Sequence, residues 1–189
     1  MHIEKTDLDG VLILTPVRHA DARGYFSESW NKARLASHGV TLNFVQDNHS
    51  FSRVSGTLRG LHFQTPPHAQ AKLMRCGRGA LLDVAVDIRH GSPSYGRWVS
   101  AELSAENGRQ LLVPVGFAHG FVTLQPDTEI LYKCTDYYAP DCDRALRFDD
   151  PAIGIDWGIT RAQAVLSDKD AAAAALADLD TPFVWEGTP

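Results

Sequence analysis

The sequence predicts an all-β protein, built as a sandwich or barrel of short strands around one core. Runs of β-branched and aromatic residues recur along the chain, each bounded by Gly, Pro, Asn or Asp, which is typical of many short strands joined by turns. Helix signals are confined to two segments. With 189 residues, of which 44% are hydrophobic, the chain can bury one sizeable core, so we expect a single domain over residues 1–189.

The expected strands share these residue types and these boundaries. They are GVLILTPV (10–17), LNFVQDN (42–48), TLRGLHFQ (57–64), ALLDVAVDI (80–88), RWVSAEL (97–103), RQLLVPV (109–115), GFVTL (120–124) and EILYKCTDYY (129–138). The alternation in LLDVAVD, residues 81–87, places aliphatic side chains on one face and two aspartates with an alanine on the other. One face is therefore expected in the core, with the other in solvent or lining a cavity.

Two segments carry helix signals. NKARLASHG, residues 31–39, predicts two turns that end at Gly39. SDKDAAAAALADLD, residues 167–180, predicts a C-terminal helix with Ser167 as its N-cap. In that helix Asp170 fits the third position of a capping box, and this local role is the favoured interpretation of its carboxylate.

Charge and cysteine usage narrow the class of protein. The net charge of -5 argues against a general nucleic-acid binder, because such proteins need a basic excess to release counterions from phosphates. The N-terminal residues resemble neither a signal peptide nor an anchor, and no run approaches the ~20 apolar residues of a spanning helix. The three cysteines form no C-x-x-C pair, which fits reduced thiols. We expect a cytoplasmic protein without membrane contacts.

Two histidines lie in strand context with glycine nearby. His119 ends the P-x-G-x-x-H spacing of PVGFAHG, residues 114–120, which hints at a cupin jelly roll. A metal site would require three or four converging ligands. After His62 the chain reads HFQTPPH to residue 68, and Lys72 occupies the position where a further ligand would fall. A protonated ammonium group cannot bind a metal, so we expect no metal and a site of organic acid–base groups.

These groups suit proton abstraction beside a carbonyl. His62 has an ordinary pKa of about 6.5 and can act as a base, while the charge of Lys72 could face a developing oxyanion. Strand parity places Tyr132 and Tyr138 on one side of the run 129–138, as a phenol donor and an aromatic platform. A base, a cation and a phenol acid together predict epimerisation through an enolate. The cation must supply several kcal/mol, because a ketone's α-proton is a weak acid.

The chain resembles the dTDP-4-dehydrorhamnose 3,5-epimerase family over about residues 9–183. The matching strings are DARGYF (21–26), FVQDNHS (44–50), LRGLHFQ (58–64), AKLMRC (71–76), LLDVAVDIR (81–89), PVGFAHGF (114–121), LYKCTDYY (131–138) and LSDKD (166–170). The resemblance implies a cupin-type jelly roll, a homodimer, no metal or cofactor, and the substrate dTDP-4-dehydro-6-deoxy-D-glucose. The implied product is dTDP-4-dehydro-L-rhamnose, for the synthesis of cell-surface polysaccharide.

Position by position, the resemblance assigns roles to residues of this chain. The base falls on His62, the general acid on Tyr132, the carboxylate that orients the base on Asp170, and the enolate-stabilising cation on Lys72. The resemblance further places in the substrate pocket Arg59, His119, Gln46, Asp47, Asn48, Lys169, Asp143 and Tyr138, whose ring would stack on thymine. Arg23 and Glu28 would reach the nucleotide from the partner subunit. Asp143 stands where a glutamate is common, and the shorter side chain weakens that assignment.

Other interpretations stay open at this level. Arg59 and His62 would lie on opposite faces of a regular strand, and we expect Gly60 to let both approach one pocket. The capping and orienting roles of Asp170 could exclude each other. A metal-dependent cupin, a sugar-nucleotide binding module, and a mono-epimerase that inverts only C3 or only C5 are the alternative functions, of which the last shares the same base and acid.

Overall fold

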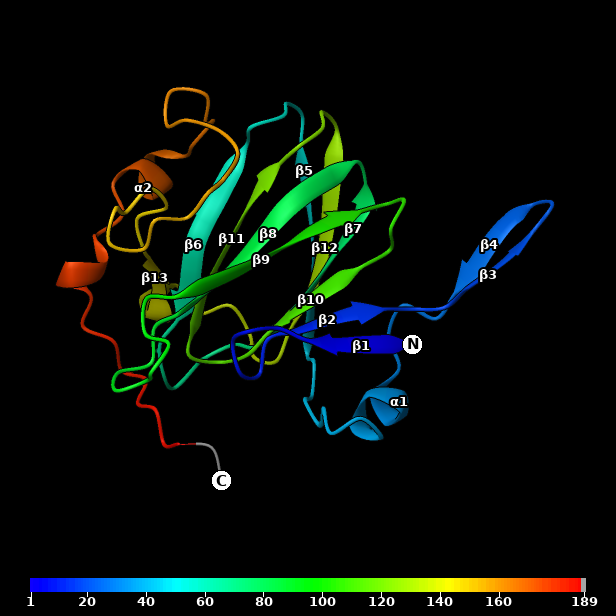
Figure 1. Cartoon of the computed structure of the whole chain (residues 1–189), viewed down its shortest axis with the longest axis horizontal. Coiled ribbons are helices and arrows are strands. Elements are labelled where there is room, and N and C mark those ends of the chain that lie inside the picture. The colour runs from blue at the N-terminus through cyan, green and yellow to red at the C-terminus, as the bar shows by residue number, and fades with distance from the viewer. Residues whose placement is uncertain (188–189) are drawn as a thin grey trace.

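Two antiparallel sheets face each other in the computed structural model, which describes residues 1–187 (Figure 1). The larger sheet contains, in spatial order, β1 (His2–Lys5), β2 (Leu12–Thr15), β10 (Gln110–Val113), β7 (Lys72–Arg78), β12 (Thr128–Cys134) and β5 (Gln46–Ser52). The smaller sheet contains β13 (Asp143–Ala145), β6 (Leu58–Gln64), β11 (Phe117–Thr123), β8 (Ala80–Asp87) and β9 (Trp98–Ser104). The all-β prediction is confirmed.

The remaining elements are short. Strands β3 (Arg18–Asp21) and β4 (Gly24–Ser27) form a hairpin that projects away from the two sheets (Figure 1). The helices are α1 (Lys32–Ala36), α2 (Asp168–Ala171) and the 3-10 turns Pro140–Cys142 and Leu176–Asp178. Within residues 1–187, no helix is both long and apolar enough to cross a membrane.

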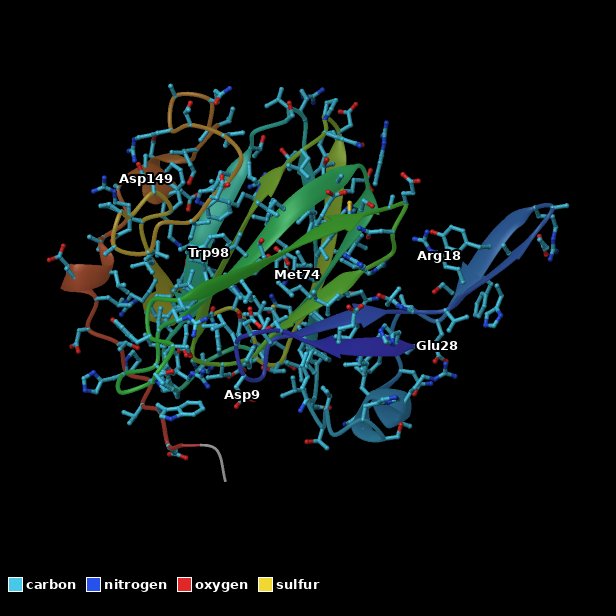
Figure 2. All side chains as sticks on the ribbon, viewed as in Figure 1. Asp9, Arg18, Glu28, Met74, Trp98 and Asp149 are labelled. Atoms are coloured by element: carbon cyan, nitrogen blue, oxygen red, sulfur yellow. The ribbon has the colours of Figure 1, made fainter. Side chains whose placement is uncertain are left out.

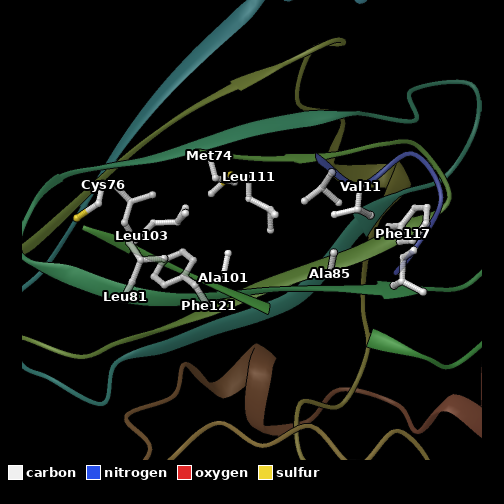
Figure 3. Packing of buried hydrophobic residues seen from close by; sticks show 13 residues of the cluster. Val11, Met74, Cys76, Leu81, Ala85, Ala101, Leu103, Leu111, Phe117 and Phe121 are labelled. Atoms are coloured by element: carbon white, nitrogen blue, oxygen red, sulfur yellow. The ribbon is translucent and has the colours of Figure 1, made fainter. Parts of the chain in front are cut away.

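The core between the sheets is formed by side chains from both of them. Met74, Leu111 and Ile130 of the larger sheet pack against Leu81 and Phe121 of the smaller one, and all five are at most 4% exposed (Figure 3). A strand contributes alternate residues to such a core, because successive side chains point to opposite faces. Met74 and Phe121 also line a cavity between the two sheets, so the core borders the space in which a site can form.

Strand β8 is buried on both faces. Its inward face carries Asp83 between Leu81 and Ala85, while Val84 and Val86 point outward beneath residues 146–183. The expected aliphatic and aspartate faces are thus present, but the aspartate face is turned toward the interior. Asp83 is 0% exposed, and a charge removed from water in this way requires an opposite charge or hydrogen-bond donors nearby.

The first predicted helix forms and the second does not extend as expected. The side chain of Asn31 caps α1 by accepting a hydrogen bond from the backbone N–H of Arg34 at 3.0 Å, and Gly39 has the left-handed φ of 84° that ends such helices. The helix predicted over 167–180 stops after α2. Beyond it, Ala174 pairs with Leu146, and Leu176 packs on the outer face of the smaller sheet. Burial of these side chains overrides the helix propensity of the alanine run.

Strand boundaries also differ from those predicted. The run expected at 42–48 forms a strand only from Gln46, and the run expected at 129–138 ends at Cys134. Strands β1, β3, β4, β7 and β13 were not among the expected runs. Four of these are at a sheet edge or in the hairpin, where half-exposed strands show little of the alternating pattern that reveals a buried one.

Candidate active site

Two adjoining cavities share three side chains, His62, Lys72 and Tyr132. The histidine cavity, of about 250 Å³, is lined by Ser50, Arg59, His62, Lys72, Met74, His119, Phe121, Tyr132, Ser167 and Asp170. The amide cavity, of about 320 Å³, is lined by Gln46, Asn48, His62, Phe63, Gln64, Gln70, Lys72, Tyr132, Cys134, Tyr138, Asp143 and Lys169. Together they bring most of the sequence-predicted site residues to one end of the two sheets.

An irregularity in β6 places Arg59 and His62 at the same cavity. His62 pairs with His119 of β11 and Arg59 pairs with Phe121, so three steps along β6 match two along β11. The extra residue acts as a β-bulge, and it turns onto one face two side chains that a regular strand would separate. Gly60, with φ of 120°, permits this path, since a Cβ there would lie 2.6 Å from the Cα of Gly120.

His62 is oriented by a carboxylate from a distant part of the chain. Its Nε2 lies 2.6 Å from Oδ1 of Asp170, and Asp170 is 4% exposed. Burial disfavours the charged carboxylate, but hydrogen bonds from His62 and Ser167 outweigh it and hold the pKa of Asp170 below its usual range. An ionised Asp170 accepts a hydrogen bond from the Nε2–H of His62, so the proton stays on Nε2 and Nδ1 keeps the lone pair needed by a base.

Ser167 caps α2, and Asp170, at the third position of that helix, orients His62. The hydroxyl of Ser167 donates to Oδ2 of Asp170 at 2.8 Å, while the backbone N–H of Asp170 donates to the Ser167 hydroxyl oxygen at 3.2 Å. The two carboxylate oxygens therefore serve different partners. The predicted capping box thus forms only in part, because the Asp170 carboxylate accepts from the Ser167 hydroxyl where a full capping box has it accept from the backbone N–H. The hydroxyl holds one carboxylate oxygen, and the other meets the imidazole.

Lys72 and Tyr132 stand on adjacent strands of the larger sheet, β7 and β12, and both line the two cavities. Burial lowers the pKa of Lys72, and the nearby Cys134, Asp143 and Asp83 act in the opposite direction. Burial raises the pKa of Tyr132, so its phenol keeps its proton at neutral pH. The pair places the Lys72 amino group, which is a cation when protonated, and a neutral O–H donor beside His62.

His119 belongs to a second histidine–carboxylate pair, which the sequence analysis did not identify. Its Nε2 lies 2.7 Å from Oδ1 of Asp83, with side chains 6% and 0% exposed. His62 and His119 are direct partners across β6 and β11. The sequence indicated a special role for Asp83 only by placing a charged residue within a strand of otherwise mostly apolar residues.

The amide cavity is ordered by hydrogen bonds at its rim. The backbone N–H of Tyr138 donates to Oε1 of Gln46 at 2.9 Å, and Nε2 of Gln46 donates to Oδ1 of Asn48 at 3.0 Å. Tyr138 follows the end of β12, so the predicted parity with Tyr132 does not apply, although both line this cavity. The Tyr138 ring is 59% exposed, and its hydroxyl donates to Asp143 at 3.4 Å. Lys169 forms an ion pair with the same carboxylate.

Three of the residues assigned by resemblance lie outside both cavities. Asp47 points away from its neighbours in β5 and pairs with Lys133 at 3.1 Å. Arg23, at the hairpin tip, is 89% exposed and pairs with Asp21. Glu28, near the base of the hairpin (Figure 2), accepts a hydrogen bond from Asn31 at 3.0 Å.

Within residues 1–187, no three His, Cys, Asp or Glu side chains are grouped so that they could hold a metal ion. The two histidines at the cavity each contact a separate aspartate, and the aspartates come from different elements. The arrangement offers two oriented imidazoles, cations from Lys72 and Arg59, and one phenol. Its chemistry is that of proton transfer beside a group that gains negative charge.

Comparison with known proteins identifies close relatives. A family model described as dTDP-4-dehydrorhamnose 3,5-epimerase matches residues 5–178. The dTDP-4-dehydrorhamnose 3,5-epimerase of Sinorhizobium fredii is 51% identical over 185 residues, which are 98% of this chain and 94% of the relative. The dTDP-6-deoxy-D-glucose-3,5-epimerase from Legionella pneumophila, solved in complex with dTDP-4-keto-L-rhamnose, superimposes with a TM-score of 0.90 at 46% identity, covering 95% of this chain and 94% of its own. A 3'-monoepimerase from Streptomyces bikiniensis, solved with dTDP-quinovose, gives 0.83 at 34% identity, with 91% and 86% covered.

Proposed function

The chain belongs to the dTDP-4-dehydrorhamnose 3,5-epimerase family, and we propose that its residues His62, Lys72 and Tyr132 carry out the epimerisation. The resemblance noted in the sequence and the cupin-type jelly roll that it implied are confirmed. The protein is an isomerase that inverts C3 and C5 of dTDP-4-dehydro-6-deoxy-D-glucose to give dTDP-4-dehydro-L-rhamnose. One observation carries the assignment of residues: a base oriented by a buried carboxylate shares a cavity with a cation and a protonated phenol.

The proposed reaction starts at Nδ1 of His62. This nitrogen removes the proton from a carbon next to the C4 ketone, and the electron pair moves into an enolate whose oxygen carries the charge. Lys72 faces that oxygen and supplies the stabilisation that the weak acidity of the substrate requires. Tyr132 then donates its proton to the same carbon from the opposite side, which inverts it. His62 then releases its proton to solvent and Tyr132 regains one from solvent, which restores the base and the acid. Repetition at the second carbon completes the product without a cofactor.

The amide cavity provides a place for the nucleotide. Gln46 and Asn48 offer amide groups, and Lys169 offers a positive charge for the diphosphate. The exposed ring of Tyr138 is free to stack on the thymine. Arg59 and His119 lie at the sugar end, beside the base. Asp143 accepts a hydrogen bond from Tyr138 and forms an ion pair with Lys169. We therefore propose that Asp143 holds these two side chains in place and also contacts the nucleotide.

A second copy of the chain is proposed to complete the site. The β3–β4 hairpin exposes Phe26 at 71% and Tyr25 at 58%, and a two-stranded hairpin has little stability without a surface to pack on. In a homodimer the hairpin would bring Arg23 and Glu28 to the partner's nucleotide, as the resemblance to the family implies. We place this dimer in the cytoplasm, in the synthesis of rhamnose for cell-surface polysaccharide.

Mixing two inactive variants tests the dimer. Chains carrying Arg23→Ala and chains carrying His62→Ala, co-expressed in equal amounts, form mixed dimers in which one site has both an intact base and an intact partner arginine. We expect about a quarter of the wild-type activity, because half of the dimers are mixed and each has one complete site. Activity no higher than the average of the two parents would place Arg23 outside the partner's site.

Deuterium wash-in tests the function itself. Incubation with the 4-keto sugar nucleotide in deuterium oxide is expected to label both C3 and C5, as followed by NMR or mass spectrometry. Label at one carbon would identify a mono-epimerase, the activity of the Streptomyces bikiniensis relative. Binding without any label would identify a binding module, and activity that follows the content of a stoichiometric metal ion would identify a metal-dependent enzyme.

A further inference from the structure

The loop that carries Tyr138 has little apolar burial to hold it in place. This Tyr138 loop, residues 135–139, runs from the end of β12 to the 3-10 turn Pro140–Cys142. Its two tyrosines, Tyr137 and Tyr138, are 64% and 59% exposed. The Tyr138 hydroxyl lies 3.4 Å from Asp143, which is long for such a hydrogen bond. The position of the Tyr138 ring is therefore set by polar contacts of the backbone on either side of it.

Gln64, the last residue of β6, binds the backbone on both sides of Tyr138. Its Nε2 donates to the carbonyl oxygen of Tyr137 at 3.1 Å, and its Oε1 accepts from the N–H of Ala139 at 2.9 Å. Nε2 also donates to the carbonyl oxygen of His68 at 2.6 Å. Two carbonyls face one end of the amide and an N–H faces the other, so the partners fix its orientation. One side chain thus connects the Tyr138 loop to the smaller sheet.

A second glutamine binds the same loop from the larger sheet. Gln46, the first residue of β5, accepts the N–H of Tyr138 itself at 2.9 Å. Both glutamines line the amide cavity, but they differ in what they can offer to a ligand. Gln64 is 4% exposed, and both of its N–H groups already donate to backbone carbonyls. Its amide is therefore suited to holding the loop and not to binding the substrate.

We propose that Gln64 is a positioning residue for nucleotide binding, which fixes the Tyr138 loop so that the ring of Tyr138 is in place before the thymine arrives. The inference rests on the stacking role of Tyr138 in the proposed function. If the loop had to become ordered when the nucleotide binds, the entropy lost in ordering it would lower the affinity. Gln64 thus acts on the nucleotide through Tyr138 and without a hydrogen bond to the substrate.

The first test is the affinity of Gln64→Met for dTDP, measured by isothermal titration. Methionine is of similar length and removes all three hydrogen bonds. We expect Kd to rise about tenfold, which is within the range for losing one base-stacking ring. KM should rise with Kd while kcat stays within about twofold, because no contact of His62 is changed. Gln163→Met is the matched control, since Oε1 of Gln163 accepts from the N–H of Thr160 at 2.8 Å outside both cavities. An unchanged Kd in Gln64→Met would overturn the proposal.

A double-mutant cycle with Tyr138→Ala separates positioning from a general loss of structure. Tyr138→Ala alone should raise the Kd of dTDP about tenfold. In that background there is no ring to position, so adding Gln64→Met should change Kd by less than about twofold. Equal fold-changes in the two backgrounds would contradict the proposal, as would a wild-type Kd in Tyr138→Ala.

A second variant keeps the test decisive if Gln64→Met does not fold. The carboxylate of Gln64→Glu keeps an acceptor for the N–H of Ala139 and loses the two donated bonds, so Kd should rise less than in Gln64→Met, and only when Tyr138 is present. A rise that is the same without Tyr138 would again reject the proposal. The cycle measures binding and not turnover. Wild-type protein that binds dTDP but exchanges no label would therefore count against the proposed function alone.

Discussion

His62→Ala is expected to abolish deuterium wash-in at both C3 and C5, with a loss of at least about 10³-fold in each rate. The loss should be equal at the two carbons, because one base removes both protons. Substrate binding should change little, since most of the proposed nucleotide contacts lie in the amide cavity. NMR of the labelled sugar measures the two exchange rates, and isothermal titration with dTDP measures binding.

Two further variants accompany His62→Ala, one as a control and one as a test of how the base is oriented. His49→Ala removes an exposed histidine of β5 that is paired with Glu129 of β12, and it should leave both exchange rates unchanged. Asp170→Asn keeps the side-chain shape but no longer fixes the Nε2 proton of His62, so exchange should slow by about 10²-fold at both carbons. Exchange retained at either carbon in His62→Ala would assign the base for that carbon to another residue.

Tyr132→Phe should separate proton removal from inversion. The base and the cation remain, so the enolate still forms, and His62 can return a solvent-derived deuteron to the face from which it took the proton. The substrate would then gain deuterium without changing its configuration. We expect product formation to fall by about 10²-fold or more, and wash-in to fall much less. Mass spectrometry of recovered substrate beside NMR of product gives the two rates from one reaction.

The neighbouring tyrosine provides the control for this variant. Tyr137 is 64% exposed and lines neither cavity, so Tyr137→Phe should preserve both rates. A Tyr132→Phe enzyme in which wash-in and inversion fall by the same factor would show that the phenol acts before or during proton removal. In that case the donor to the opposite face would have to be found elsewhere in the cavity.

The parts of this protein that could be predicted from sequence are those with a strong local pattern. Residues 81–87 alternate in residue type with the period of two that a strand requires, and Asn31 with Gly39 marks the ends of α1 by capping chemistry. His62, Lys72 and Tyr132 were grouped because base, cation and acid form a recognisable set. Resemblance then supplied Asp170, which no local pattern would have connected to His62.

The features that could not be predicted from the sequence depend on contacts between distant segments of the chain. The alanine run after Asp170 has high helix propensity, but Ala174 pairs with Leu146 and Leu176 packs on the outer face of the smaller sheet. Whether Asp170 closes a capping box or orients His62 was open until one of its oxygens was seen at the imidazole and the other at the hydroxyl of the N-cap Ser167. Asp83 was overlooked because a charge within a strand does not reveal which layer it faces, and only the stacking of the sheets decides that.

The bond between His62 and Asp170 also has a consequence for the synthesis of the chain, because it joins residues 108 positions apart. Both sheets are complete once β13 has been made, and α2 follows more than twenty residues later. A nascent chain could therefore assemble its core while the imidazole still lacks its carboxylate. Under the proposed assignment, His62 therefore gains its carboxylate only when α2 docks beside β6, after the sheets that hold the imidazole have formed.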